Sequence, residues 1–168
     1  NTINEKKLTI ETGRQFEERA FARLTDADIN IIHKGESIEA SADLKFTNYN
    51  NESLTGYLFS LNPGLKVTGV GSAGRELNFK QTYNIIEIDP GKSLAPGESD
   101  SIKISYAGTI SESFCYPNYD DNIKETPYRA VMLNINKRQA YLTDKYALQT
   151  PETHWYPVPG LNYYTSNP

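Results

Sequence analysis

The side chains that could carry out chemistry are few and far apart in this sequence. The chain has two histidines, His33 and His154, and a single cysteine, Cys115. A catalytic zinc needs three protein ligands, often including two histidines at helical spacing, and these two are distant in sequence. Cys115 would need a histidine partner to act as a nucleophile, so we expect a half-buried thiol instead. We therefore predict no catalytic residue and no metal ligand, with both histidines at the surface or in packing contacts.

A glycine-rich segment matches a nucleotide-binding pattern in its letters. Residues 69–74 are Gly-Val-Gly-Ser-Ala-Gly, which fits G-x-G-x-x-G. That motif holds a pyrophosphate at the N-terminus of the helix that follows it. Residues 75–88 alternate like strands and leave no room for a helix and a return strand. The sequence therefore favours a glycine-rich hairpin over a nucleotide site.

Two acidic stretches resemble partial calcium sites. Residues 26–30 follow the pattern Asp-x-Asp-x-Asn, like the opening of a calcium-binding helix-loop-helix loop. Such a loop requires Gly at its sixth position and Glu at its twelfth, where this chain has Ile31 and Ser37. Residues 120–122, Asp-Asp-Asn, have no further oxygen ligands nearby in sequence and predict a solvated loop.

Alternating apolar and polar residues predict the strands that position these groups. Residues 38–46 alternate cleanly, which is typical of a strand with one face in a core. Ile29 and Ile31 alternate before them, and Lys34-Gly35-Glu36 predicts a hairpin turn. Further short strands are expected at 54–61, 65–67, 77–79, 83–88, 102–106 and 131–135.

Short strands separated by Pro/Gly turns predict an all-β fold. Asn62-Pro63-Gly64 is a strong turn signal, because Pro presets one dihedral angle and Gly accepts positive φ. We predict an antiparallel β-sandwich over residues 25–168, ending in an irregular aromatic and Pro-rich segment. Residues 1–24 are expected to be a lead-in segment, either a short helix or an edge strand.

Composition excludes several classes of function. The net charge is -4 with no basic stripe, which argues against nucleic-acid binding. No apolar run approaches the ~20 residues that span a bilayer, and one cysteine cannot form an intrachain disulfide. The chain begins at Asn1 without a methionine, so we expect a piece of a longer protein. Its cellular location is not predicted.

Short motifs follow one another in a familiar order. They are an amphipathic strand at 36–48, Leu-Asn-Pro-Gly-Leu-Lys-Val at 61–67, Gly-Arg-Glu-Leu-Asn-Phe at 74–79, Leu-Ala-Pro-Gly-Glu at 94–98, Ser-Tyr-Ala-Gly at 105–108, Leu-Gln-Thr-Pro-Glu at 148–152 and Trp-Tyr-Pro at 155–157. This series resembles the N-terminal β-sandwich domain of aminopeptidase N-like zinc metallopeptidases. It is most similar to the versions found in bacterial ABC-transporter permease-like membrane proteins.

The resemblance implies a scaffold and substrate-cleft wall without catalytic machinery. In that family the zinc helix lies in the next domain, so zinc is implied for a following domain and no cofactor for this chain. A Gln-x-Glu segment of the family supplies a carboxylate that meets the free amino group of a substrate. Gln149 and Glu152 occupy the corresponding place as candidate substrate-binding residues, although their spacing departs from the family pattern. A turn-stabilising role for Glu152 is an equal alternative.

The aromatic end of the chain is the expected contact with that following domain. Candidate interface residues are Trp155, Tyr156, Tyr163 and Tyr164. The same aromatics could instead cover one end of the sandwich. A peptide is a further candidate partner, whereas we expect no direct membrane contact by this segment. The alternative function is an immunoglobulin-like binding or adhesion module, because a fold does not fix a function.

Overall fold

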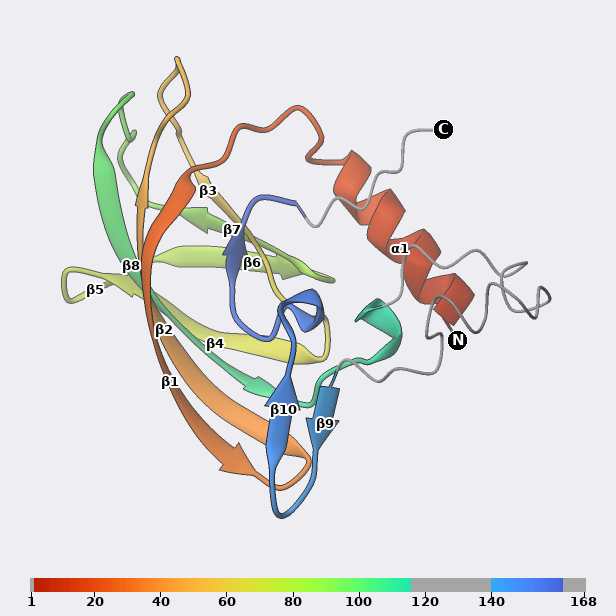
Figure 1. Cartoon of the computed structure of the whole chain (residues 1–168). Helices are drawn as coiled ribbons and strands as arrows, with labels where there is room; N and C mark the ends of the chain where they lie inside the picture. The colour runs from red at the N-terminus through yellow and green to blue at the C-terminus, as the bar shows by residue number, and fades with distance from the viewer. Residues whose placement is uncertain (1, 116–139, 162–168) are drawn as a thin grey trace.

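The computed structural model describes residues 2–115 and 140–161 (Figure 1). In chain order its elements are α1 (Thr2–Arg14), β1 (Arg23–Lys34), β2 (Ser37–Thr47), β3 (Tyr57–Ser60), β4 (Leu65–Ser72), β5 (Arg75–Glu76), β6 (Asn78–Thr82), β7 (Ile85–Asp89), β8 (Ser99–Gly108), the 3-10 turn η1 (Ser113–Cys115), β9 (Ala140–Leu142), β10 (Ala147–Gln149), the 3-10 turn η3 (Pro151–Thr153) and β11 (Val158–Pro159). The strands predicted at 131–135 and the acidic loop at 120–122 lie outside the described residues.

The strands form two facing sheets and one separate hairpin. A five-stranded sheet has the order β1-β2-β8-β4-β5, and a four-stranded sheet has the order β11-β3-β7-β6 (Figure 1). Strands β9 and β10 pair only with each other within the described part of the chain. The strand pairs are antiparallel. These sheets confirm the predicted all-β antiparallel sandwich.

The core lies between the two sheets, where the sequence alternation placed it. On β2, Ile38, Ala42, Leu44 and Phe46 are buried, and on β8 the buried residues are Ile102, Ile104 and Tyr106. The Phe46 ring meets Tyr57 and Phe59 of β3 edge to face, with centroids 4.7 and 5.7 Å apart. These aromatic contacts join the five-stranded sheet to the four-stranded sheet.

The predicted hairpins form with the expected turn residues. Gly35 has a φ of 66° at the first of two turn positions between β1 and β2, a conformation that favours glycine. In the G-x-G-x-x-G segment, Ala73 and Gly74 have φ values of 49° and 77°, which suits a type I′ turn. Strands β4 and β5 pair across this turn and no helix follows, so the glycine-rich hairpin is confirmed.

Strand β1 departs from its expected burial. Its register sets Ile29 opposite Ala42 and Ile31 opposite Ala40, which places both isoleucines on the inner face. Ile31 is nevertheless 44% exposed, because β1 is the outermost strand of its sheet. Apolar alternation identified the strand but not its place in the sheet.

The lead-in segment contains a helix that is tied to the sandwich. Helix α1 carries Glu5 in its first turn and Arg14 in its last, which suits the helix dipole. The Ser111 hydroxyl donates to the Glu5 carboxylate, and beyond the helix Phe16 is buried against Leu58. Strand β1 begins at Arg23, and the division of the chain at residue 24 stays a prediction. Among the described residues no helix is long and apolar enough to cross a membrane.

Candidate functional site

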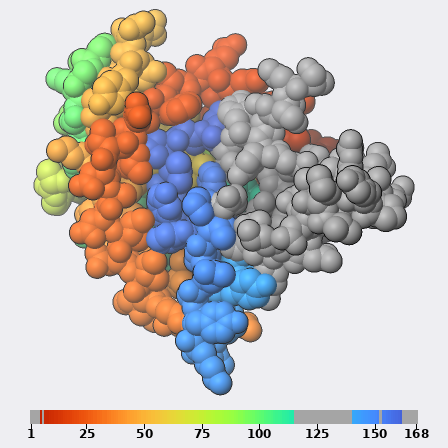
Figure 2. All heavy atoms as spheres, in the orientation of Figure 1, coloured from red at the N-terminus to blue at the C-terminus, as the bar shows by residue number. Residues whose placement is uncertain are grey.

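Residues 140–161, called here the C-terminal segment, hold most of the predicted site. This segment runs across the molecular surface beside the β1–β2 hairpin (Figure 2). Asn62, the first residue of the turn signal after β3, anchors it. The Asn62 backbone N–H donates to the carbonyl of His154, and its side-chain amide donates to the carbonyl of Thr153 at 2.9 Å.

The side chain of Asn62 uses its full hydrogen-bonding capacity in a fully buried position. Its Nδ2 also donates to the carbonyl of Ser111 at 3.1 Å. Its Oδ1 accepts from the backbone N–H groups of Gly64 and Ser111 at 3.0 and 2.8 Å. The side-chain amide of Asn62 thus connects three parts of the chain, which are the β3–β4 turn, the loop that follows β8, and η3. The turn signal in the sequence located Asn62 but gave no sign of this anchoring role.

Gln149 is the most unusual polar residue in the C-terminal segment. It ends β10, opposite Ala140 of β9. Both polar atoms of its side-chain amide are buried, and neither has a hydrogen-bond partner among the described residues. A buried amide without partners costs free energy, so such groups often mark a binding role. Glu152 lies three residues later in η3, and its side chain falls outside the described part of the structure.

The aromatic candidates divide into two groups. Trp155 and Tyr156 are half-buried, meet edge to face with centroids 4.9 Å apart, and pack against the main core. Tyr163 and Tyr164 lie outside the described residues. Elsewhere in the segment, Tyr146 and Leu148 are 55% and 53% exposed. Trp155 and Tyr156 therefore pack on the main core while keeping part of their surface accessible.

Both histidines contact other parts of the protein. His154 has a φ of 48°, its Nδ1 lies 3.1 Å from the Ser60 hydroxyl, and its ring meets Phe114 edge to face. The Nε2 of His33 lies 2.7 Å from the carbonyl oxygen of Gly35. Cys115 lies in η1, and its side chain is not described.

No metal-binding set is found in the described part of the chain. Its His, Cys, Asp and Glu side chains form no group of three or more that could hold a metal ion. Zinc therefore does not fit the described residues, and no chemical step in this chain is assigned to it.

Two tyrosines near the segment have altered acidity. Burial, with a smaller contribution from Tyr156, raises the pKa of Tyr106 well above its usual range, and no described residue hydrogen-bonds to its hydroxyl. Burial, followed by the Glu5 charge, raises the pKa of Tyr83 to about 12. Both phenols therefore stay neutral at physiological pH and act as polar packing groups.

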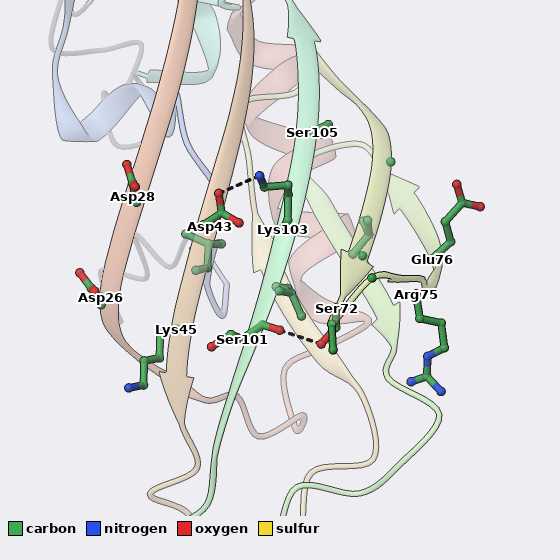
Figure 3. Close-up of a pocket in the computed structure, with 17 residues that line it drawn as sticks. Asp26, Asp28, Asp43, Lys45, Ser72, Arg75, Glu76, Ser101, Lys103 and Ser105 are labelled. Carbon is green, nitrogen blue, oxygen red and sulfur yellow. Dashed lines mark hydrogen bonds and ion pairs between the residues drawn. The ribbon is translucent and has the colours of Figure 1, made fainter.

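A separate hollow of about 690 Å³ lies on the outer face of the five-stranded sheet (Figure 3). Gly69 and Gly71 line it, and neither has a side chain to fill the space over β4. Lys103 forms an ion pair with Asp43 at 3.0 Å inside it. The Ser72 hydroxyl donates to a backbone carbonyl across the same surface. These pairings leave an open polar surface without an arrangement suited to catalysis.

Comparison with solved structures identifies the fold. The chain matches an M1 zinc metallopeptidase mutant from Deinococcus radiodurans, bound to a Tyr-Ser-Ala substrate, with a TM-score of 0.59 and 18% identity over 83% of this chain and 29% of that one. A two-domain M1 zinc metallopeptidase mutant bound to L-arginine matches with a TM-score of 0.60 and 17% identity, over 84% of this chain and 30% of that one. No family model matches the chain, and no curated protein matches it.

These matches concern less than a third of each solved chain. The shared part is a β domain like that of the M1 metallopeptidases, which agrees with the resemblance seen in the sequence. At this level of identity the likeness shows the fold alone. The activity and substrates of the solved proteins are theirs and bear on this chain only as a proposal.

Proposed function

We propose that this chain is the non-catalytic N-terminal β-sandwich of a metallopeptidase-like protein, where it forms one wall of the substrate cleft. The observation that carries the proposal is the match of 83–84% of this chain to M1 zinc metallopeptidases. The catalytic zinc would then belong to a domain that follows this one.

The proposed substrate contacts are Gln149 and Glu152. A peptide could supply the hydrogen bonds that the buried Gln149 amide lacks. A carboxylate at Glu152 suits the free amino terminus of a peptide, because a desolvated ammonium needs an opposite charge. The two residues lie three positions apart in the chain, Gln149 at the end of β10 and Glu152 in η3.

The surroundings of the parent protein are proposed on the sequence resemblance. That resemblance favours a bacterial ABC-transporter permease-like membrane protein, with this domain outside the bilayer. The partly accessible Trp155 and Tyr156 are the proposed contact with the following domain. Aromatic side chains are common at such contacts because they bury a large area with few rotatable bonds.

The test compares the 168-residue chain with the full protein that its gene encodes. Bound zinc and release of N-terminal amino acids from short peptides are measured in both. The proposal expects zinc and activity in the full protein alone. Zinc without activity indicates that the full protein is a degenerate peptidase. This domain would then keep its scaffold role in a protein that no longer cleaves peptides. Absence of both overturns the peptidase relationship.

Substitutions in the full protein separate the two contacts. We expect Glu152→Gln to raise KM about tenfold with a smaller effect on kcat, because it removes a charge and preserves shape. Glu52→Gln, at an exposed loop position, is the matched control and should leave KM unchanged. An unchanged KM in Glu152→Gln overturns the amino-group contact.

The second candidate is an immunoglobulin-like binding or adhesion module. It is favoured by the sandwich architecture and by the exposed Tyr146 and Leu148 on the β9–β10 hairpin. A full protein that lacks zinc and peptidase activity but captures a ligand through this hairpin supports it. Loss of capture in Tyr146→Ser with retained folding would identify the hairpin as the contact.

A further inference from the structure

The short turn η3, which carries Glu152, closes on itself through local bonds. The backbone N–H of Thr153 donates to the carbonyl of Thr150 at 3.1 Å, and the Thr153 hydroxyl donates to the same carbonyl at 2.7 Å. Bonds within a 3-10 turn fix its shape but not its place on the domain. The place of Glu152 is therefore set by the contacts that the neighbouring residues make with the sandwich.

The two carbonyl groups that follow Glu152 in the chain are both bound by Asn62. Its side-chain Nδ2 donates to the carbonyl of Thr153 at 2.9 Å, and its backbone N–H donates to the carbonyl of His154 at 2.8 Å. Asn62 and Thr153 are fully buried, so these bonds are made away from water. Two consecutive peptide groups are thus attached to one residue of the sandwich.

The remaining groups of Asn62 hold it in place. Its Oδ1 accepts from the backbone N–H groups of Gly64 and Ser111, and its backbone carbonyl accepts from the N–H of Leu65 at 2.9 Å. These partners lie in the β3–β4 turn, in the loop after β8 and at the start of β4. A side chain bonded on all sides cannot rotate to follow a displaced turn, so Asn62 is a fixed point for η3.

The chain on either side of this attachment is less firmly bonded to the sheets. Before Glu152, β10 pairs with β9 alone among the described strands. After it, the pairing of β11 with β3 begins only at Val158. Among the described residues, the backbone hydrogen bonds nearest to Glu152 that reach the body of the sandwich are therefore those of Asn62.

We propose that Asn62 is a positioning residue for Glu152, an inference that rests on the proposed contact between Glu152 and the amino terminus of a peptide. By holding the backbone directly after Glu152, Asn62 sets where this residue stands in the cleft wall. Productive contacts depend steeply on placement, since a misplacement of about 1 Å costs up to about 100-fold in rate. Asn62 thereby affects peptide binding without touching the peptide.

Asn48 provides a matched control elsewhere in the sandwich. It is also fully buried, and its Nδ2 donates to the carbonyls of Glu52 and Leu94, both at 2.9 Å. Its Oδ1 accepts from the backbone N–H of Asn50 at 2.9 Å. None of these partners belongs to the C-terminal segment. Asn62→Asp and Asn48→Asp therefore delete the same two amide-to-carbonyl bonds, but only the first loosens η3.

The first test measures how well the full protein recognises the amino group of a peptide. Alanyl-alanine and propionyl-alanine, which lacks only the α-amino group, compete with a chromogenic aminoacyl substrate in initial-rate assays. The unsubstituted protein should favour alanyl-alanine about tenfold, and Glu152→Gln should abolish this preference. Asn62→Asp should reduce it to about threefold or less with a smaller change in kcat, whereas Asn48→Asp should preserve it.

Two further variants complete the test. Because Asn62 acts through Glu152, adding Asn62→Asp to Glu152→Gln should raise KM no further. A further rise would show that Asn62 acts independently of Glu152 and would overturn the positioning role. Asn62→Ala places no charge against the two carbonyls, and it replaces Asn62→Asp if circular dichroism shows that the latter does not fold.

The outcomes separate this inference from the proposed function. If Glu152→Gln abolishes the preference and Asn62→Asp preserves it, the positioning role is overturned and the Glu152 contact stands. An equal loss in Asn48→Asp also overturns the positioning role, because the effect would then follow from reduced stability. An unsubstituted protein that cleaves no peptide, or that does not distinguish the two competitors, overturns the Glu152 contact and this inference with it.

Discussion

The sandwich core and the C-terminal segment are held in place by different forces. In the core, apolar side chains of β2, β8, β3 and β7 fill the space between two sheets. The C-terminal segment packs on that core only in part and is also held by directed hydrogen bonds, from the buried Asn62 amide and from the pairing of β11 with β3. Both regions contain paired aromatic rings, but the segment also contains the buried Gln149 amide, which has no hydrogen-bond partner in the described part of the chain.

This difference indicates which region of the molecule can accommodate a ligand-binding site. A core of close-packed apolar groups gains stability from every contact and tolerates little change. A segment held by a few directed bonds leaves room for an unsatisfied polar group that a ligand can complete. The stable region supplies the scaffold, and the less uniformly packed region supplies the candidate binding groups.

The largest effect is expected in the core. Phe46→Ala should lower the free energy of unfolding by about 3–5 kcal/mol, because Phe46 is fully buried and contacts two other rings. Phe79→Ala is the control, since Phe79 is 38% exposed on the edge strand β6 and should cost much less. Urea unfolding measures both variants. Equal losses would contradict the location of the core.

The next largest effect is expected at the anchor of the C-terminal segment. Asn62→Ala should cost about 2–4 kcal/mol, because it leaves the N–H groups of Gly64 and Ser111 without their acceptor. Asn78→Ala, at an exposed position, should change stability by less than about 0.5 kcal/mol. Proteolysis should also cut the C-terminal segment faster in Asn62→Ala. A uniform loss across the molecule would show that the segment and core are not separable.

A smaller effect is expected from alkaline pH. Because the folded-state pKa of Tyr83 is raised to about 12, the folded protein keeps its proton where the unfolded chain loses it. Stability should therefore fall as the pH rises from about 10 to 12. The Tyr83 share is on the order of 1 kcal/mol, since the phenol is only partly buried and solvent screens its interactions. Tyr83→Phe should flatten this part of the curve, and an unchanged slope would contradict the assignment.

The smallest effect is expected at Gln149. Gln149→Leu should leave stability unchanged or raise it by up to about 1 kcal/mol, because it removes a buried amide that lacks partners. Gln81→Leu is the contrasting variant, since Gln81 accepts from the N–H of Val67 and donates to the carbonyl of Leu65. It should cost about 1–3 kcal/mol. A comparable loss in Gln149→Leu would mean that this amide is satisfied in solution.

Local patterns predicted the parts of the fold that depend on neighbours in sequence. The alternation in β2 and β8 located their buried faces, and the glycines of the two hairpins located their turns. Both properties follow from the two-residue period of a strand and from the positive φ that a tight turn needs. The sandwich could therefore be predicted from sequence alone.

Properties that depend on distant partners were not predictable in the same way. The exposure of Ile31 depends on the order of strands in the sheet, which alternation does not encode. Asn62 was predicted only as a turn residue, because its partners come from remote parts of the chain. The buried state of the Gln149 amide likewise arises from tertiary packing. The candidate site was located through family resemblance, and its geometry came from the structure.

The position of Asn62 also has a consequence for the order of folding. Its amide bonds to Thr153, 91 positions away along the chain, whereas the residues paired between β2 and β8 are only 52 to 70 positions apart. Contacts across such long loops form late, because the entropy of loop closure must be overcome before they contribute. The C-terminal segment should therefore dock onto a sandwich that is already formed. Asn62→Ala should then accelerate unfolding while leaving the refolding rate nearly unchanged.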